Sequence, residues 1–189
     1  MTPKISLRPV KSTDTDYDLI QDLLLSAFPE CERRDLPEQS HNVDADDVPM
    51  TCFAAYETAT NRLIGFATIW DMGAYRYIEH LATADIARNC GYGGMILDQI
   101  IDMSASPIVL EVEPEEMDPM ARRRIGFYER HGLHLWRDRD YLQPPYRAGG
   151  ESVRLMLMAT EGLTPEAHFD GIVRDLVSVV YPPQSDSVR

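Results

Sequence analysis

A glycine-rich segment near the middle of the chain has the composition of a phosphate-binding loop. From Arg88 to Gly94 it reads Arg-Asn-Cys-Gly-Tyr-Gly-Gly, and it lies between a predicted strand and a predicted helix. Glycines let a backbone approach a ligand closely, and the free N–H groups and dipole of a helix start attract an anion. Arg88 adds a fixed positive charge. The segment therefore predicts a phosphate site, with a tight glycine turn that binds nothing as the simpler alternative.

Two common nucleotide-binding loops fit this segment poorly. A Walker loop ends in Gly-Lys-Ser or Gly-Lys-Thr, and neither follows here. The dinucleotide fingerprint requires a third glycine or alanine where Ile96 stands, and it belongs early in a βαβ unit. A protein that uses this loop for ATP or NAD is therefore disfavoured.

A second segment further along the chain supports another interpretation of the loop. From Ile125 to Leu133 it reads Ile-Gly-Phe-Tyr-Glu-Arg-His-Gly-Leu, at the end of a predicted helix. This segment resembles the second signature of the Gcn5-related N-acetyltransferases (GNAT superfamily), and the Arg-x-x-Gly-x-Gly spacing from Arg88 resembles their pyrophosphate loop. The two signatures occur in the family's order, separated by the apolar run Ile108 to Val112. The resemblance covers residues 5–158.

The resemblance implies an N-acetyltransferase that moves an acetyl group from acetyl-CoA to a primary amine of a small molecule or a peptide. In this family the amine attacks the thioester directly in a ternary complex, so no catalytic cysteine is expected. The family alignment makes Leu81 the backbone donor to the thioester oxygen and pairs Thr83 with the pantetheine arm. The cofactor-binding residues that it implies are Leu81, Ala82, Thr83, Arg88, Asn89, Cys90, Gly91, Tyr92, Gly93 and Gly94.

Acetyl transfer to an amine requires an acid for the leaving thiolate and a base for the ammonium. Tyr128 occupies the family's position for the acid, and an ordinary tyrosine pKa of about 10 lies near that of a thiol. It also lies on an apolar helical stripe, so a core aromatic is the alternative. Glu79 is the first candidate for the base and Glu113 the second, with Glu111 on the same strand face as Glu113. For each carboxylate, a solvated or ion-paired surface group is the alternative.

Three other groups of residues receive simpler interpretations. Strand alternation directs His80 away from Glu79, which favours a structural histidine. His131 lies in the last turn of its helix, where a cation suits the helix dipole. The acidic residues Asp44, Asp46 and Asp47 are candidates for steering a polyamine or an aminoglycoside, but a solvated loop explains them equally well.

The second signature departs from the family pattern at three positions. Ala121 stands where an asparagine is frequent, Arg124 replaces a small residue and Leu133 replaces a phenylalanine. These departures keep open an alternative from another class, a catalytically silent acyl-CoA-binding module that acts as a sensor or scaffold. The acceptor is expected to be set by the variable loops at residues 28–50 and 138–152, and its identity and the acyl length stay open.

Hydrophobic periodicity predicts the elements that position these residues. Expected strands are residues 5–9, 52–57, 63–70, 75–83, 108–112, 133–137 and 153–158. Expected helices are residues 16–28, 95–103, 118–131 and 164–180, with Thr164 as a hydroxyl cap. This order predicts one α/β domain, and the resemblance makes it the acyl-CoA N-acyltransferase fold, a mixed, centrally splayed sheet flanked by helices. The domain is expected at 1–160, with a C-terminal helical extension and frayed tail at 161–189.

Composition restricts the partners. The 189-residue chain carries a formal net charge of −13, which disfavours nucleic acid and anionic membranes as partners. Three cysteines without metal-ligand spacing predict neither a disulfide framework nor a metal site. The start of the chain lacks the apolar core of a signal peptide, and a cytoplasmic location is expected. The oligomeric state stays open, a homodimer included.

Overall fold

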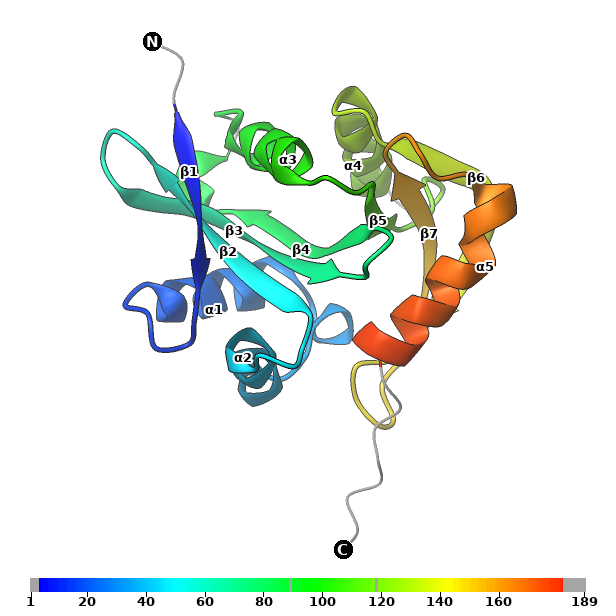
Figure 1. The fold of residues 1–189 in the computed structure, drawn as a ribbon, viewed down its shortest axis with the longest axis horizontal. Coiled ribbons are helices and arrows are strands. Elements are labelled where there is room, and N and C mark those ends of the chain that lie inside the picture. Colours follow the sequence, from blue (N-terminus) through cyan, green and yellow to red (C-terminus); the bar gives the residue numbers. More distant parts are fainter. Residues whose placement is uncertain (1–3, 89, 118, 182–189) are drawn as a thin grey trace, which may run out of the picture. The chain divides into compact units, whose positions relative to one another are not determined.

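The computed structural model describes residues 4–88, 90–117 and 119–181, and the chain divides into two compact units (Figure 1). The first unit comprises residues 1–29 and 35–108, and the second comprises residues 30–34 and 109–189. Each unit combines antiparallel strands with helices packed against them. The predicted fold class, an α/β sheet flanked by helices, is confirmed. The predicted central splay and the boundary at residue 160 stay predictions.

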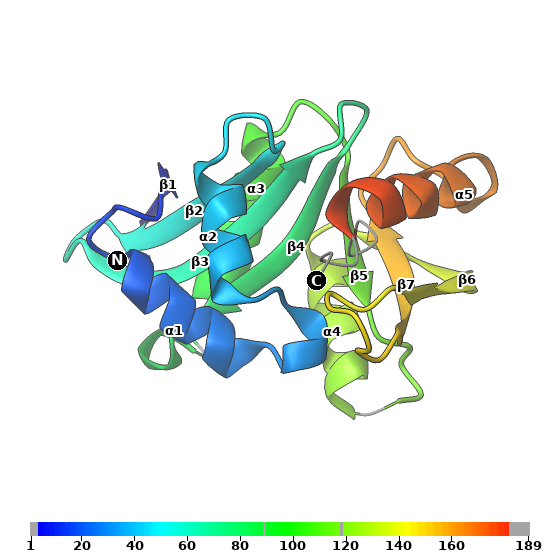
Figure 2. The same cartoon turned by 90° about the horizontal axis from the view of Figure 1, so that it is seen from below.

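The first unit is built on a four-stranded antiparallel arrangement. Its strands follow one another in the order β1 (Ile5–Val10), β2 (Met50–Glu57), β3 (Arg62–Asp71) and β4 (Arg76–Thr83). Helices α1 (Tyr17–Ala27) and α2 (Leu36–Asp44) cover one face, and α3 (Tyr92–Met103) covers the other (Figures 1 and 2). The predicted hairpin of residues 52–57 and 63–70 is confirmed as β2 and β3, with Asn61 at a φ of 54° in the turn.

Helix α3 begins at Tyr92 rather than at Met95, so the predicted start of this helix is wrong. Gly91 precedes the helix at a φ of 81°, a conformation that glycine adopts readily. Gly93 and Gly94 therefore lie in the first turn instead of in a loop. Glycine costs only about 0.5–1 kcal/mol in a helix, which the burial of Tyr92 and Ile96 offsets.

Strand β4 contains a bulge that the sequence pattern did not reveal. Thr68 of β3 pairs with His80, whereas the next residue, Ile69, pairs with Ile78. Glu79 is therefore an extra residue without an opposite partner in the ladder. A bulge changes the directions in which neighbouring side chains point, which affects both Glu79 and His80.

The second unit contains the remaining strands and helices among the described residues. Strand β7 (Val153–Ala159) pairs antiparallel with both β5 (Ile108–Val112) and β6 (His134–Gln143). Helix α4 (Pro119–Arg130) precedes β6, and Gly132 follows the helix at a φ of 83°. The predicted strands at 108–112 and 153–158 are confirmed, and β6 is longer than the predicted 133–137. Asp118, the predicted start of α4, lies outside the described residues.

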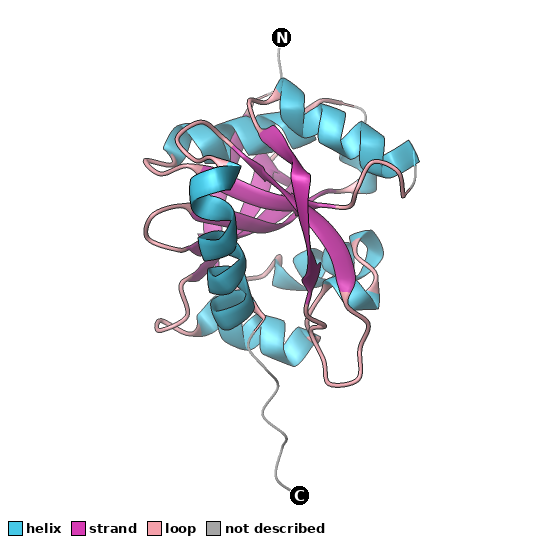
Figure 3. Ribbon diagram, turned by 90° about the vertical axis from the view of Figure 1, so that its right-hand side faces the viewer, coloured by secondary structure: helices cyan, strands magenta, loops and turns pink. Residues whose placement is uncertain are grey.

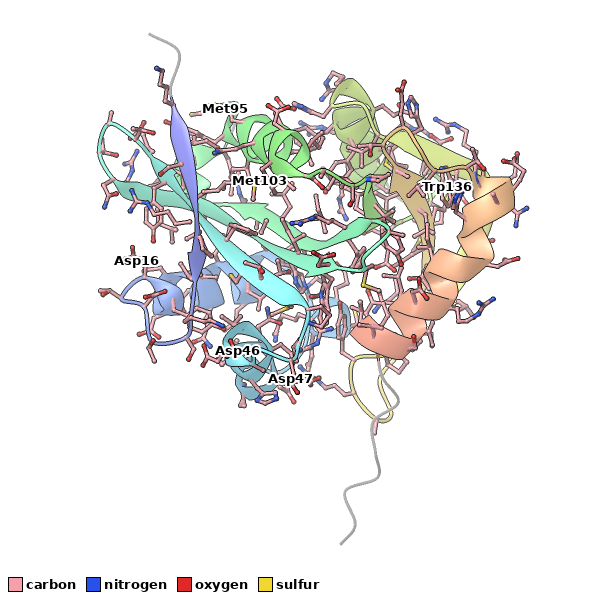
Figure 4. All side chains as sticks on the ribbon, viewed as in Figure 1. Asp16, Asp46, Asp47, Met95, Met103 and Trp136 are labelled. Carbon is pink, nitrogen blue, oxygen red and sulfur yellow. The ribbon has the colours of Figure 1, made fainter. Side chains whose placement is uncertain are left out.

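The predicted C-terminal helix is present as α5 (Pro165–Asp175), which continues as a π-helical turn over Leu176–Val180. Helix α5 faces the viewer in Figure 3. Its apolar stripe is buried, and Phe169 lies 6.3 Å from Trp136 of β6, measured between ring centroids. Trp136 is labelled in Figure 4. The predicted hydroxyl cap is wrong: the Thr164 side chain makes no cap hydrogen bond. Instead the Thr164 backbone N–H donates to His168 Nδ1 at 3.0 Å.

A buried arginine joins the end of this extension to the start of the unit. Arg34 is 1% exposed, donates from Nη2 to the Val180 carbonyl at 2.5 Å and lies 5.0 Å from the ring of Tyr146. Tyr146 in turn packs edge-on against Tyr181. Residues 30–34 are therefore fixed to the second unit, although their neighbours in sequence belong to the first. Within the described residues, no helix has both the length and the apolarity to cross a bilayer.

Candidate active site

The glycine segment in the first unit has the geometry of an anion site at a helix start. After β4 a 3₁₀ turn, Asp85–Ala87, leads to Arg88, whose half-exposed side chain lies 2.9 Å from Asp85. Gly91 then turns the chain into α3, a 12-residue helix whose first N–H groups, as in any helix, have no partner within the helix. Asn89 lies outside the described residues. These features fit a pyrophosphate group, which would meet backbone donors and one guanidinium.

Two close contacts lie next to the glycine segment, one at Tyr92 and one between the strands that precede it. The Tyr92 hydroxyl donates to Glu57 at the end of β2, and Thr60 and Tyr92 together lower the pKa of the Glu57 carboxyl. Gly65 of β3 lies so close to β4 that an added Cβ would stand 2.5 Å from the Ala82 carbonyl oxygen and 2.9 Å from Ile96 Cδ1. Sequence reasoning missed Gly65, whose signal is a glycine inside an otherwise apolar strand.

The predicted backbone donors lie at the end of β4. Leu81, Ala82 and Thr83 are its last three residues, and they pair with Ala67, Phe66 and Gly65 of β3. Ala82 is buried, while Leu81 and Thr83 are half-buried. The strand therefore leads directly into the glycine segment.

Glu79 belongs to a buried polar cluster in the first unit. Its side chain has no exposed surface, and its Oε2 accepts a hydrogen bond from Trp70 Nε1 at 2.8 Å. The same oxygen lies 3.7 Å from His80 Nδ1, so the prediction that these two side chains diverge is wrong. The bulge at Glu79 breaks the alternation on which that prediction rested. His80 Nδ1 also lies 3.0 Å from Thr68 Oγ1, and its ring packs edge-on against Phe28.

Tyr128 lies on α4 in the second unit and is 9% exposed. Burial raises the pKa of its phenol to about 12, with the nearby charge of Arg124 lowering the pKa and that of Glu113 raising it. Within the described part of the chain its hydroxyl makes no hydrogen bond. Its ring contacts Phe127 at 5.2 Å between centroids. The side chain is therefore a largely buried phenol that stays protonated at neutral pH.

Carboxylates surround this part of the second unit. Glu113, directly after β5, accepts from Arg124 Nη1 at 2.5 Å. Glu32 of the 3₁₀ helix Glu30–Glu32 has its pKa raised by burial and by the charge of Glu113, and lowered less by Arg124. Glu111 accepts from the Tyr181 hydroxyl at 2.7 Å. Glu113 is thus ion-paired, as the alternative to a base allowed, and Glu111 is bonded to a tyrosine rather than solvated. Sequence reasoning did not single out Glu32.

Comparison with known proteins agrees with both signatures. The acetyltransferase (GNAT) family model matches residues 17–133. A structure from Bacteroides thetaiotaomicron, assigned to the GNAT family of acetyltransferases, is 35% identical over 95% of this chain and 99% of its own, with a TM-score of 0.87. This chain belongs to the GNAT acetyltransferase family. No curated protein sequence matches it.

More distant GNAT structures share the fold. A GNAT acetyltransferase from Elizabethkingia anophelis with acetyl-CoA bound is 18% identical, at a TM-score of 0.57, over 83% of this chain and 97% of its own. Arabidopsis thaliana NAA60 in complex with acetyl-CoA is 19% identical, at a TM-score of 0.59, over 82% of this chain and 97% of its own. The prediction of an acetyl-CoA-dependent acyltransferase is confirmed at the level of the family.

The GNAT chain also has a pocket in its second unit. The pocket has a volume of about 350 Å³ and is lined by Glu30, Cys31 and residues 145–151. Arg147 forms an ion pair with Glu30 at its wall. Both lining segments come from the loops that the sequence assigned to acceptor choice, residues 28–50 and 138–152.

The acidic residues after α2 have a structural explanation. Asp44 accepts hydrogen bonds from the Ser12 backbone N–H and hydroxyl, and these bonds lower the pKa of its carboxyl. Asp46 is fully exposed and lies 3.8 Å from Lys11 (Figure 4). These contacts favour a structural role for Asp44, which holds the Ser12 turn, and a surface ion pair for Asp46 over the steering of a substrate.

The three cysteines have contrasting environments. Cys52 is buried in β2, and burial raises the pKa of its thiol to about 12. Cys31 and Cys90 are exposed, one in each unit. No group of three metal-ligating side chains occurs within the described residues.

Proposed function

We propose that this protein transfers an acetyl group from acetyl-CoA to a primary amine of a small molecule or a peptide, by direct attack in a ternary complex. The observation that carries the proposal is Tyr128. It is a buried phenol with a pKa of about 12, at the family's position for the acid that protonates the leaving thiolate. A phenol that stays protonated at neutral pH can supply that proton.

The chain's own residues divide the remaining tasks. Arg88 and the first N–H groups of α3 would hold the pyrophosphate of acetyl-CoA, which supplies the activated acetyl group when bound. The Leu81 N–H would donate to the thioester oxygen as it becomes anionic, and Thr83 would pair with the pantetheine arm. Glu79 and Glu113 are the two predicted candidates for the base. Their contacts favour Glu113, because Glu79 has no exposed side-chain surface.

Isothermal calorimetry with acetyl-CoA tests the first half of the proposal. The variant Gly93→Glu places a carboxylate in the first turn of α3 and is expected to abolish binding through repulsion of the pyrophosphate. Gly171→Glu is the matched control, because the same change on α5 meets open space. No binding by the wild-type protein would contradict the proposal.

An amine screen with acetyl-CoA tests the second half. Release of coenzyme A that depends on an amine is expected in the wild type and is expected to be lost in Tyr128→Phe. Binding of acetyl-CoA without transfer to any amine would favour the alternative, a silent acyl-CoA-binding module. The cytoplasmic location and the homodimer stay predictions.

A further inference from the structure

The end of the C-terminal extension is bonded to the first of the two segments that line the pocket of the second unit. Its last helical turn, Leu176–Val180, ends with the Val180 carbonyl, to which no later residue of the helix donates. Arg34 Nη2 donates to this carbonyl at 2.5 Å, and a cation suits the dipole at a helix C-terminus. Arg34 closely follows Cys31, which lines the pocket. The first wall of the pocket is therefore held by the end of the extension.

The second wall contacts the same end of the extension through aromatic rings. Tyr146, which lines the pocket, lies edge-on to Tyr181, with 5.0 Å between ring centroids and 73° between ring planes. The guanidinium carbon of Arg34 lies 5.0 Å from the centroid of the same Tyr146 ring. Tyr146 and Tyr181 are 6% and 3% exposed, so both contacts are made away from water, where they are strongest. Arg34 thus joins the extension to both walls.

Tyr181 is itself fixed at two points. Its hydroxyl donates to Glu111 of β5 at 2.7 Å, and its backbone N–H donates to the Leu176 carbonyl at 3.0 Å. Glu111 lies opposite Leu157 in the ladder between β5 and β7. The contacts therefore run from the sheet through Tyr181 to the second wall.

The second wall is a closed turn. The Gly150 N–H donates to the Arg147 carbonyl at 3.0 Å, and Gly149 between them has a φ of 78°. A Cβ added at Gly150 would stand 2.9 Å from Pro145 Cβ, so the two ends of the turn are in close contact. Because the turn is closed in this way, a shift of Tyr146 displaces the whole wall.

Resting on the proposed function, we infer that Arg34 and Tyr181 are positioning residues for the amine acceptor: they set the spacing of the two pocket walls and thereby determine which amines bind. Neither residue is assigned a contact with the acceptor. The pocket volume of about 350 Å³ lies near the lower end of the range for ligand sites, so a small change in spacing alters what fits. The extension, which lies beyond the family resemblance at residues 5–158, is in this way part of the acceptor site.

Steady-state kinetics with benzylamine and butylamine test the inference. Tyr181→Ala removes the ring that contacts Tyr146 and is expected to raise the KM for the amine by about tenfold or more, with kcat and the KM for acetyl-CoA within about twofold of wild type. Arg34→Met removes the bond to Val180 and is expected to act in the same direction. An unchanged amine KM in both variants, or equal rises of the two KM values, would overturn the inference.

Two further variants distinguish positioning from general stability. Tyr181→Phe keeps the ring against Tyr146 and loses only the bond to Glu111, so it is expected to retain the amine KM of wild type. Phe169→Leu alters another buried aromatic of the extension, one that packs on Trp136. It is expected to lower the free energy of unfolding, measured by urea denaturation, without raising the amine KM. A rise equal to that of Tyr181→Ala would show that the extension only stabilises the unit, and would overturn the inference.

Hydrogen exchange followed by mass spectrometry measures the positioning without turnover. In Tyr181→Ala and Arg34→Met, the amides of residues 30–34 and 145–151 are expected to exchange at least about tenfold faster than in wild type. Phe169→Leu is expected to leave both walls at the wild-type rate. Unchanged exchange at the walls in Tyr181→Ala and Arg34→Met would overturn the inference whether or not either amine is a substrate.

Calorimetry with acetyl-CoA separates this inference from the proposed function. The wild type and all four variants are expected to bind acetyl-CoA with the same affinity, because the predicted cofactor residues belong to the first unit. If the wild type binds no acetyl-CoA, the proposed function fails. If all the proteins bind it and the walls of Tyr181→Ala and Arg34→Met exchange as in wild type, only the positioning assignment fails.

Discussion

The polar groups around β4 and those around Tyr128 lie in different surroundings. In the first unit, Glu79 accepts from Trp70, His80 lies against Thr68, and Tyr92 donates to Glu57. In the second unit, burial and neighbouring charge raise the pKa values of Tyr128 and Glu32. Perturbed titratable groups cluster at functional sites more often than satisfied ones do. We therefore expect the residues around β4 to hold the cofactor in place and Tyr128 to transfer a proton.

The largest expected effect concerns Tyr128. Tyr128→Phe keeps the ring and its packing on Phe127 but removes the hydroxyl. Loss of a general acid should lower kcat by about 10²–10⁴-fold, with an unchanged dissociation constant for acetyl-CoA measured by calorimetry. An unchanged kcat in Tyr128→Phe would contradict the role of Tyr128 as the acid that protonates the leaving thiolate.

The next effect concerns the close packing of the first unit. Gly65→Ala places a methyl group 2.5 Å from the Ala82 carbonyl oxygen, so β3 and β4 must separate. The free energy of unfolding, measured by urea denaturation, should fall by about 1–3 kcal/mol. Gly171→Ala, which meets open space on α5, should be neutral or slightly stabilising. Equal stability of both variants would contradict the close packing described at Gly65.

A smaller effect distinguishes the two candidate bases. Glu79→Gln retains an oxygen that accepts from Trp70 Nε1, so both stability and kcat should stay close to wild type. Glu79→Ala removes this acceptor and should lower the free energy of unfolding by about 1 kcal/mol. A large loss of kcat in Glu79→Gln, with a normal circular dichroism spectrum, would move the base to the first unit.

The smallest effect is a change in stability with pH. A carboxyl with a raised pKa binds its proton more tightly in the folded state than in the unfolded state. Its contribution to stability is therefore lost as pH rises from the ordinary glutamate value through the raised pKa. Glu32→Gln should remove this loss, so its melting temperature relative to wild type should increase from pH 4 to pH 7. A constant difference would show that Glu32 titrates normally.

Much of the framework could be predicted because it depends on local patterns. Hydrophobic periodicity was sufficient for the β2–β3 hairpin, for α1 and for the buried strand β5. The family signatures located Tyr128 and the glycine segment, because both depend on residues adjacent in sequence. Their roles at the site stay predictions.

What could not be predicted depends on contacts between distant residues. The bulge at Glu79 results from pairing with β3, and strand alternation alone does not reveal it. Glu32 looked like an ordinary acidic loop residue, because the Arg34–Val180 bond that fixes its helix joins positions 146 residues apart. The close approach at Gly65 likewise requires knowledge of what lies opposite.

The cysteines give this protein a built-in pair of attachment points. A thiol must be ionised to react with a maleimide, and burial together with a pKa of about 12 keeps Cys52 inert. Cys31 and Cys90 are exposed and belong to different units. Cys90 belongs to the predicted pyrophosphate loop, and Cys31 lines the pocket of the second unit. The rate at which each thiol reacts with a maleimide would therefore report on ligand binding: acetyl-CoA should slow the labelling of Cys90, and an acceptor in the pocket should slow that of Cys31, without introducing a new residue.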